Sequence, residues 1–143
     1  MKLLPLVAER STCPRRAVGA IITDAAGHIL ATGYNGTPAG SDHCTDKPCP
    51  GAADPAGDTT RCYAVHAEQN ALLQCRELAR AEVMYVSCTP CFTCAKLLAN
   101  TGIQRVVVAD DYVGDDRGAF VLRSFKRLWR YDPVADTITP AKR

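Results

Sequence analysis

The apolar residues of this chain gather in short runs that are typical of β-strands. Five such runs are bounded by turn residues or by helical stretches, and they cover residues 17–23, 28–32, 83–87, 105–109 and 128–131. The turn sequence Asp24-Ala25-Ala26-Gly27 directly follows the first run. It predicts that the first two strands form a hairpin.

Helices are predicted in four segments outside these strands, at residues 3–10, 64–79, 89–100 and 117–128. In the third helix, Thr89 is expected as the N-cap and Pro90 at the first helical position, and Gly102 stops it. This order of strands and helices predicts an α/β fold, a three-layer α/β/α sandwich on a mixed five-stranded sheet. The length of 143 residues fits one domain, 1–143.

Composition narrows the class of protein. Hydrophobic residues make up 47% and charged residues 22% of the chain, which is typical of a globular protein. A net charge of +2 is too small to indicate a nucleic-acid groove, yet it does not repel an anionic substrate. Glu9 and Arg10 limit the apolar start to about six residues, whereas a signal peptide needs roughly 7–15. We therefore expect a cytoplasmic protein without membrane or nucleic-acid partners.

Eight cysteines are unusual for such a chain, and without an export signal they favour metal binding over disulfides. Two motifs stand out, His66-Ala67-Glu68 and Pro90-Cys91-Phe92-Thr93-Cys94. Zinc prefers imidazole and thiolate ligands, so His66, Cys91 and Cys94 are the candidate ligands. Glu68 can then move a proton without binding the metal. The alternative is a structural zinc site, or a buried histidine beside unrelated cysteines.

These motifs resemble those of deoxycytidylate (dCMP) deaminases of the zinc-dependent cytidine deaminase superfamily. The resemblance covers roughly residues 3–115, and it extends to the segments Val18–Ile22, Gly33–Gly40, His66–Ala71, Thr89–Lys96 and Gly102–Val107. It implies a cytidine deaminase-like fold, one catalytic zinc, and usually a homohexamer. It also implies hydrolysis of dCMP to dUMP and ammonia by a zinc-activated water, which supplies dUMP for thymidylate synthesis.

The resemblance also implies roles for individual residues. Asn35 is expected to hold the deoxyribose hydroxyl, Ala67 and the carbonyl of Thr89 to contact the substrate, and Tyr112 to lie near the sugar-phosphate. Arg15 and Arg16 precede the first strand, where relatives place basic residues near phosphate; a solvated pair is the alternative. Glu77 stands where some regulated relatives carry arginine, which argues against control by dCTP and dTTP.

Four further cysteines lie in or beside the glycine- and proline-rich stretch 33–61, which is predicted to be a long loop. They are Cys13, Cys44, Cys49 and Cys62. Cysteines at similar places hold a second, structural zinc in phage and competence-operon relatives, so a Cys₄ zinc site is expected here; the alternative is four unlinked thiols. His43 is a weaker alternative ligand. Cys75 and Cys88 are expected in the core.

Two kinds of rival function stay open. One is a deaminase for another small base or nucleotide, such as cytidine, guanine, a modified dCMP or a tRNA adenosine. The other is an inactive, zinc-stabilised binding module, which would have little reason to keep a carboxylate at Glu68.

Overall fold

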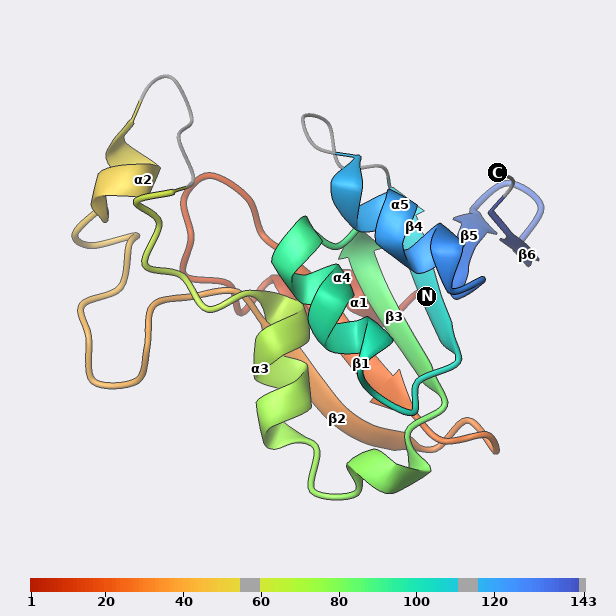
Figure 1. The fold of residues 1–143 in the computed structure, drawn as a ribbon. Coiled ribbons are helices and arrows are strands. Elements are labelled where there is room, and N and C mark those ends of the chain that lie inside the picture. Colours follow the sequence, from red (N-terminus) through yellow and green to blue (C-terminus); the bar gives the residue numbers. More distant parts are fainter. Residues whose placement is uncertain (55–59, 111–115, 142–143) are drawn as a thin grey trace.

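The computed structural model describes residues 1–54, 60–110 and 116–141. Within these residues, six strands form one mixed sheet in the order β2-β1-β3-β4-β5-β6 (Figure 1). The strands are β1 (Gly19–Thr23), β2 (Ile29–Tyr34), β3 (Val83–Cys88), β4 (Arg105–Asp110), β5 (Leu128–Asp132) and β6 (Thr137–Pro140). β1 is antiparallel to both β2 and β3, the β3-β4-β5 pairs are parallel, and β6 is antiparallel to β5.

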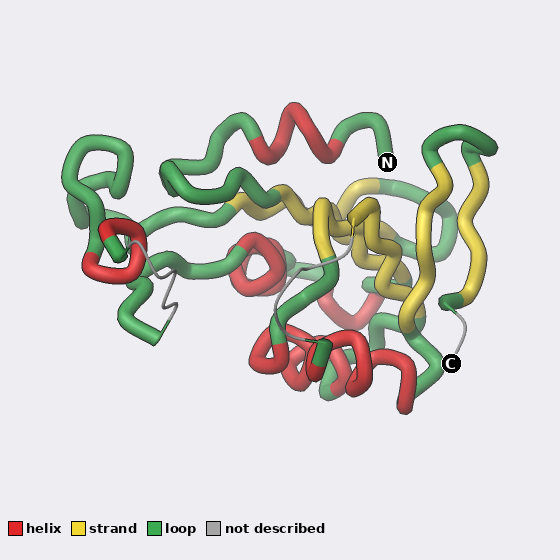
Figure 2. Tube along the Cα trace, turned by 90° about the horizontal axis from the view of Figure 1, so that it is seen from above, coloured by secondary structure: helices red, strands yellow, loops and turns green. Residues whose placement is uncertain are grey.

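Helices cover both faces of the sheet, as the predicted three-layer sandwich requires. The short α1 (Leu4–Ala8) lies on one face, and α3 (Ala67–Gln74), α4 (Phe92–Ala99) and α5 (Arg117–Ser124) lie on the other (Figure 2). The 3₁₀ turn η1 (Leu78–Arg80) follows α3, and α2 (Pro50–Ala53) sits in the long loop, away from the sheet. Among the described residues, no helix combines the length and apolar character that a membrane crossing requires.

The core lies between the sheet and the three-helix layer. Ile22, Met84 and Val106 of the strands are 0% exposed, as are Leu98 of α4 and Leu122 of α5. These side chains belong to one core cluster that joins α4 and α5 to the sheet.

The sheet has one strand more than the five predicted. The additional strand is β6, which pairs with β5 through the main chain: Trp129 lies opposite Pro140, and Asp132 lies opposite Thr137. All four residues of β6 are exposed. A strand with no buried face leaves no apolar alternation in the sequence, so the pattern could not reveal it.

Two helix starts differ from the prediction. α3 begins at Ala67 and not at residue 64, because Val65 exchanges main-chain hydrogen bonds with Gly36 (2.8 and 3.2 Å) and is extended. The N-cap of α4 is Cys91 and not Thr89. The amide of Thr89 instead donates to the carbonyl of Asp110 (2.9 Å), which prolongs the β3-β4 pairing beyond the expected helix start.

Two helix ends and the long loop also differ. α3 ends at Gln74 because Cys75 adopts an extended backbone, and α5 ends at Ser124, short of Lys126, whose φ is 57°. The stretch 33–61, predicted as loop, includes the end of β2 and the short α2.

One glycine allows α3 to approach the sheet closely. A Cβ atom at Gly33 of β2 would fall on the carbonyl of Ala67 and the amide of Ala71. Only hydrogen fits there, so Gly33 sets the height of α3, and of the His66–Glu68 segment, above the sheet.

Candidate metal centre and active site

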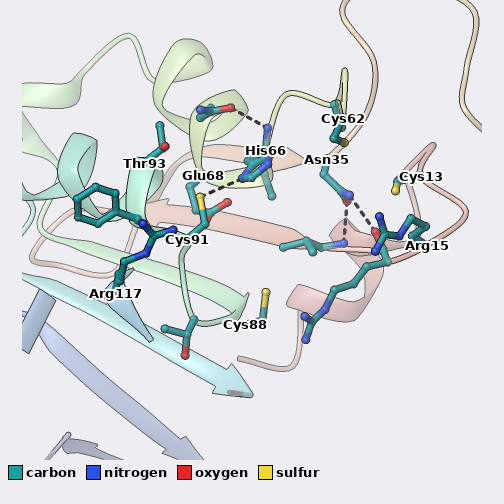
Figure 3. Close-up of a pocket in the computed structure, with 17 residues that line it drawn as sticks. Cys13, Arg15, Asn35, Cys62, His66, Glu68, Cys88, Cys91, Thr93 and Arg117 are labelled. Carbon is teal, nitrogen blue, oxygen red and sulfur yellow. Dashed lines mark hydrogen bonds between the residues drawn. The ribbon is translucent and has the colours of Figure 1, made fainter. Parts of the chain in front are cut away.

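The two sequence motifs meet where α3 and α4 begin (Figure 3). His66 is the N-cap of α3, Cys91 is the N-cap of α4, and Cys94 lies in the first turn of α4. Nδ1 of His66 lies 3.5 Å from Sγ of Cys91 and 3.5 Å from Sγ of Cys94. In the described part of the chain, these three residues form the group whose ligand atoms all lie within 4.8 Å of one another.

This donor set fits zinc. Nitrogen and sulfur ligands at about 2.0–2.3 Å around a tetrahedral ion lie roughly 3.5–3.8 Å apart, which agrees with the separations seen here. Three protein ligands also leave a fourth position open, as catalytic zinc sites do and closed structural sites do not. The geometry of these three residues therefore fits a zinc site of the catalytic kind.

The cluster also supplies the required thiolate. A hydrogen bond from the Cys94 thiol lowers the pKa of Cys91 to about 4, against the opposing effect of burial. The same bond, together with burial, raises the pKa of Cys94. The pKa of His66 is raised by its hydrogen bond with Cys91. One ligand is thus ionised already at neutral pH, and a cation is the natural partner of such a group.

Glu68 lies in the first turn of α3, beside the ligands, and is only 4% exposed. Burial raises its pKa, so the carboxyl group accepts a proton more readily than an ordinary glutamate. Gln69 holds this helix start in place, because its Oε1 accepts a hydrogen bond from the amide of His66 (2.9 Å). This role of Gln69 was not predicted from the sequence, although a glutamine three residues after an N-cap is a capping-box signal.

A cavity of about 580 Å³ opens above these residues (Figure 3). That volume is in the range of small-molecule sites. Three residues with predicted substrate contacts line it, namely Asn35, Ala67 and Thr89. Tyr112 lies outside the described residues. Cys75 belongs to the core as predicted, whereas Cys88 is buried but lines the cavity.

Arginines give the cavity a basic wall. The cavity is lined by Arg15, Arg16 and, from the first turn of α5, Arg117. The guanidinium of Arg117 lies 5.2 Å from the ring centre of Phe92. Arg15 also donates to the carbonyl of Gly51 in α2 (2.7 Å). Arg117 was not predicted at the cavity, because only the tertiary structure brings the start of α5 beside α4. Phe92 belongs to the predicted Pro90–Cys94 motif, but its place on the cavity wall was not predicted.

The four remaining cysteines gather more loosely than the His66 group. Burial would raise the pKa of Cys49, but hydrogen bonds from the main chain at Tyr63 and from the Cys44 and Cys62 thiols lower it to about 7. Cys13 is close enough to influence both Cys44 and Cys62 electrostatically. Cys13 and Cys62 also line the cavity, so this cluster borders the candidate active site.

Comparison with known proteins is consistent with this geometry. Residues 1–110 match the family described as the cytidine and deoxycytidylate deaminase zinc-binding region. A deoxycytidylate deaminase of Mycobacterium phage D29 is 45% identical over 107 residues, which cover 70% of this chain and 83% of the relative. That of Schizosaccharomyces pombe is 33% identical over 96% of this chain, but the chain spans only 44% of that longer protein.

A solved structure shares the fold. The dCMP deaminase of cyanophage S-TIM5, in complex with dCMP and dUMP, superposes with a TM-score of 0.70 at 30% identity. The match covers 90% of this chain and 91% of the phage chain.

Proposed function

We propose, since the chain belongs to the cytidine and deoxycytidylate deaminase family, that it hydrolyses dCMP to dUMP and ammonia. The observation that carries the proposal is the placement of a buried Glu68 beside the His66, Cys91 and Cys94 ligands, at a cavity lined by Asn35. The related phage enzyme that binds dCMP and dUMP supports this choice of substrate. The product would supply thymidylate synthesis.

In this reaction, water adds at C4 of the cytosine ring and the amino group leaves as ammonia. His66, Cys91 and Cys94 would hold a zinc ion, which would supply the Lewis acidity that lowers the pKa of a water molecule. Glu68 takes up a proton from the attacking water and passes it to N3 of the ring. It then takes the proton of the new C4 hydroxyl and delivers it to the amino group, which leaves as ammonia while C4 becomes a carbonyl. Burial raises the pKa of Glu68, which makes the carboxylate a better proton acceptor than an exposed glutamate.

The remaining cavity residues position the nucleotide. Ala67 and the carbonyl of Thr89 contact the base, and Asn35 holds the sugar hydroxyl. Arg15 and Arg16 offer positive charge for the phosphate. The resemblance to the family assigns Tyr112 a role at the sugar-phosphate. The assignment is supported because one cavity is lined by Arg15, Arg16, Asn35, Ala67 and Thr89.

A second, structural zinc is proposed at Cys13, Cys44, Cys49 and Cys62. Thiol contacts from Cys44 and Cys62 to Cys49, and the low pKa of Cys49, support it. The long loop has few apolar residues that could pack against the domain, so zinc coordination by these cysteines would order the loop and the adjoining cavity wall.

We further propose a single domain, 1–143, that assembles into a homo-oligomer, with a hexamer favoured, in the cytoplasm. One continuous sheet, with β2 and β6 at its edges, supports the single domain. Large exposed apolar side chains on the helix layer, such as Leu73 (77%) and Phe120 (66%), support assembly. Light scattering of the purified protein gives the subunit number.

The decisive experiment is a turnover screen of the zinc-loaded protein with ammonia release as the readout. The panel holds dCMP, CMP, dCTP, deoxycytidine, 5-substituted dCMPs, guanine and a tRNA anticodon stem-loop. We expect the highest kcat/KM for dCMP. A higher value for another compound would replace dCMP as the substrate, and no turnover of any compound would favour the inactive binding module.

A further inference from the structure

The side chain of Asn35 is held by hydrogen bonds to the segment that precedes β1. Its Oδ1 accepts from the amide of Val18 (2.8 Å) and from the hydroxyl of Ser11 (2.7 Å). Its Nδ2 donates to the carbonyl of Arg16 (2.8 Å). The residue is 8% exposed, and it faces the cavity from the end of β2 (Figure 3).

These bonds leave Asn35 with one kind of hydrogen bond to offer. An amide side chain has two acceptor lone pairs and two N–H groups. Among the described residues, partners fill both lone pairs and one N–H. The amide cannot flip, because the main-chain amide of Val18 can only donate and would then face another donor. What remains is one N–H, so the matching atom of a ligand must be an acceptor.

Ser11 completes this arrangement from a distant part of the sequence. Its Oγ accepts a hydrogen bond from the amide of Cys13 (3.2 Å), so its own hydrogen is directed to Asn35. Two acceptors of Asn35 lie within reach, Oδ1 at 2.7 Å and the main-chain oxygen at 3.0 Å. Ser11 thus ties the turn after α1 to the residue after β2, 24 positions later.

We infer that Ser11 is a positioning residue for nucleotide binding. It fixes the amide of Asn35 so that the remaining N–H serves an acceptor oxygen on the sugar of the substrate. Ser11 itself does not line the cavity and acts through Asn35. This inference rests on the proposed reaction with dCMP.

The test is a double-mutant cycle on the zinc-loaded full chain. Ser11→Ala should raise KM for dCMP about tenfold, with kcat within about twofold, since about one hydrogen bond of ground-state positioning is lost. Ser11→Thr, which keeps the hydroxyl, should restore most of the affinity. In an Asn35→Ala background, Ser11→Ala should change KM less than about twofold. Ser124→Ala is the matched control, because its hydroxyl donates to the carbonyl of Phe120 on the exposed side of α5.

The outcomes separate the inference from the proposed function. An unchanged KM in folded Ser11→Ala, or effects of Ser11→Ala and Asn35→Ala that simply add, would overturn the role of Ser11. If Ser11→Ala does not fold, Ser11→Cys preserves the volume with a weaker donor and should show the same rise in KM. A wild-type protein that binds but does not turn over dCMP contradicts the proposed function alone. In that case, calorimetry measures the Kd for dCMP in the same set of variants, and the changes in Kd are judged by the limits given above for KM.

Discussion

Replacement of Glu68 by glutamine tests the proposed chemistry most directly. The two side chains have nearly the same volume, so the cavity and the first turn of α3 keep their packing around a residue that is 4% exposed. The amide can hydrogen-bond to water and to the base but cannot carry a proton between them. The substitution therefore removes the proton transfer and leaves the shape of the site.

The expected loss follows from that one function. Proton transfer by a positioned side chain typically contributes 10²–10⁴-fold, so kcat should fall by about 10³, or about 4 kcal/mol of transition-state stabilisation. KM should change only a few-fold, because Glu68 is not needed to hold the ground state. Burial raises the pKa of Glu68, which means that the fold disfavours the ionised form more than water does. An uncharged glutamine avoids that cost, so Tm should not fall.

The assay combines three measurements on each variant. Loss of cytosine absorbance and ammonia release give kcat and KM, metal analysis gives the zinc content, and thermal unfolding gives Tm. Glu9→Gln, on an exposed residue after α1, is the matched control and should behave like the wild type. Turnover of Glu68→Gln within about threefold of wild type, at full zinc content, would refute the proton shuttle. Loss of zinc from the variant would instead show that Glu68 is a ligand.

Four further outcomes are expected. Cys44→Ser should lower the zinc content from about two ions per chain to about one and reduce Tm while retaining some activity; a wild-type content near one, with all four cysteines freely alkylated, would contradict the structural site. Gly33→Ala should reduce kcat/KM at least tenfold, because a Cβ there displaces α3, whereas Gly102→Ala, where a Cβ meets nothing within 4 Å, should change it less than twofold. Leu98→Ala should lower the free energy of unfolding by about 2–5 kcal/mol in chemical denaturation, since Leu98 is 0% exposed; a loss below about 1 kcal/mol would contradict its place in the core. Hydrogen bonds from His28 and Arg80 lower the pKa of Asp24 to about 2, so its ionised form stabilises the fold above pH 4, and this stabilisation is lost as the pH falls to 2. The Tm of Asp24→Asn should therefore lie below that of the wild type by its full amount at pH 5 and by less below pH 4, and a Tm difference that does not depend on pH would contradict this.

Local chemistry made half of the metal centre predictable from sequence. Cys91 and Cys94 are three residues apart at a helix start, so one turn of helical backbone brings them together without any tertiary contact. The same holds for His66 and Glu68, which share the first turn of α3. All five predicted strands, β1 to β5, are present in the structure, because each buries some of its residues and so leaves an apolar run in the sequence.

Features without a local signal were mispredicted or missed. β6 has no buried face, and the true N-cap of α4 depends on the pairing of Thr89 with Asp110 in another strand. Arg117 and Cys88 reach the cavity through contacts that no spacing in the chain encodes. Tertiary contacts outweigh local propensity at such positions.

The sequence by itself determined which residues can hold zinc and move a proton, since those abilities belong to the side chains and to their spacing within one turn. Only the tertiary structure decided that His66 meets Cys91 and Cys94 across 25 and 28 positions, and that Ser11 meets Asn35 across 24. The physical reason is that such meetings depend on how α3 and α4 seat on the sheet and on the hydrogen bonds around Asn35. Packing and main-chain pairing of the whole domain set those positions, and no short stretch of residues specifies them.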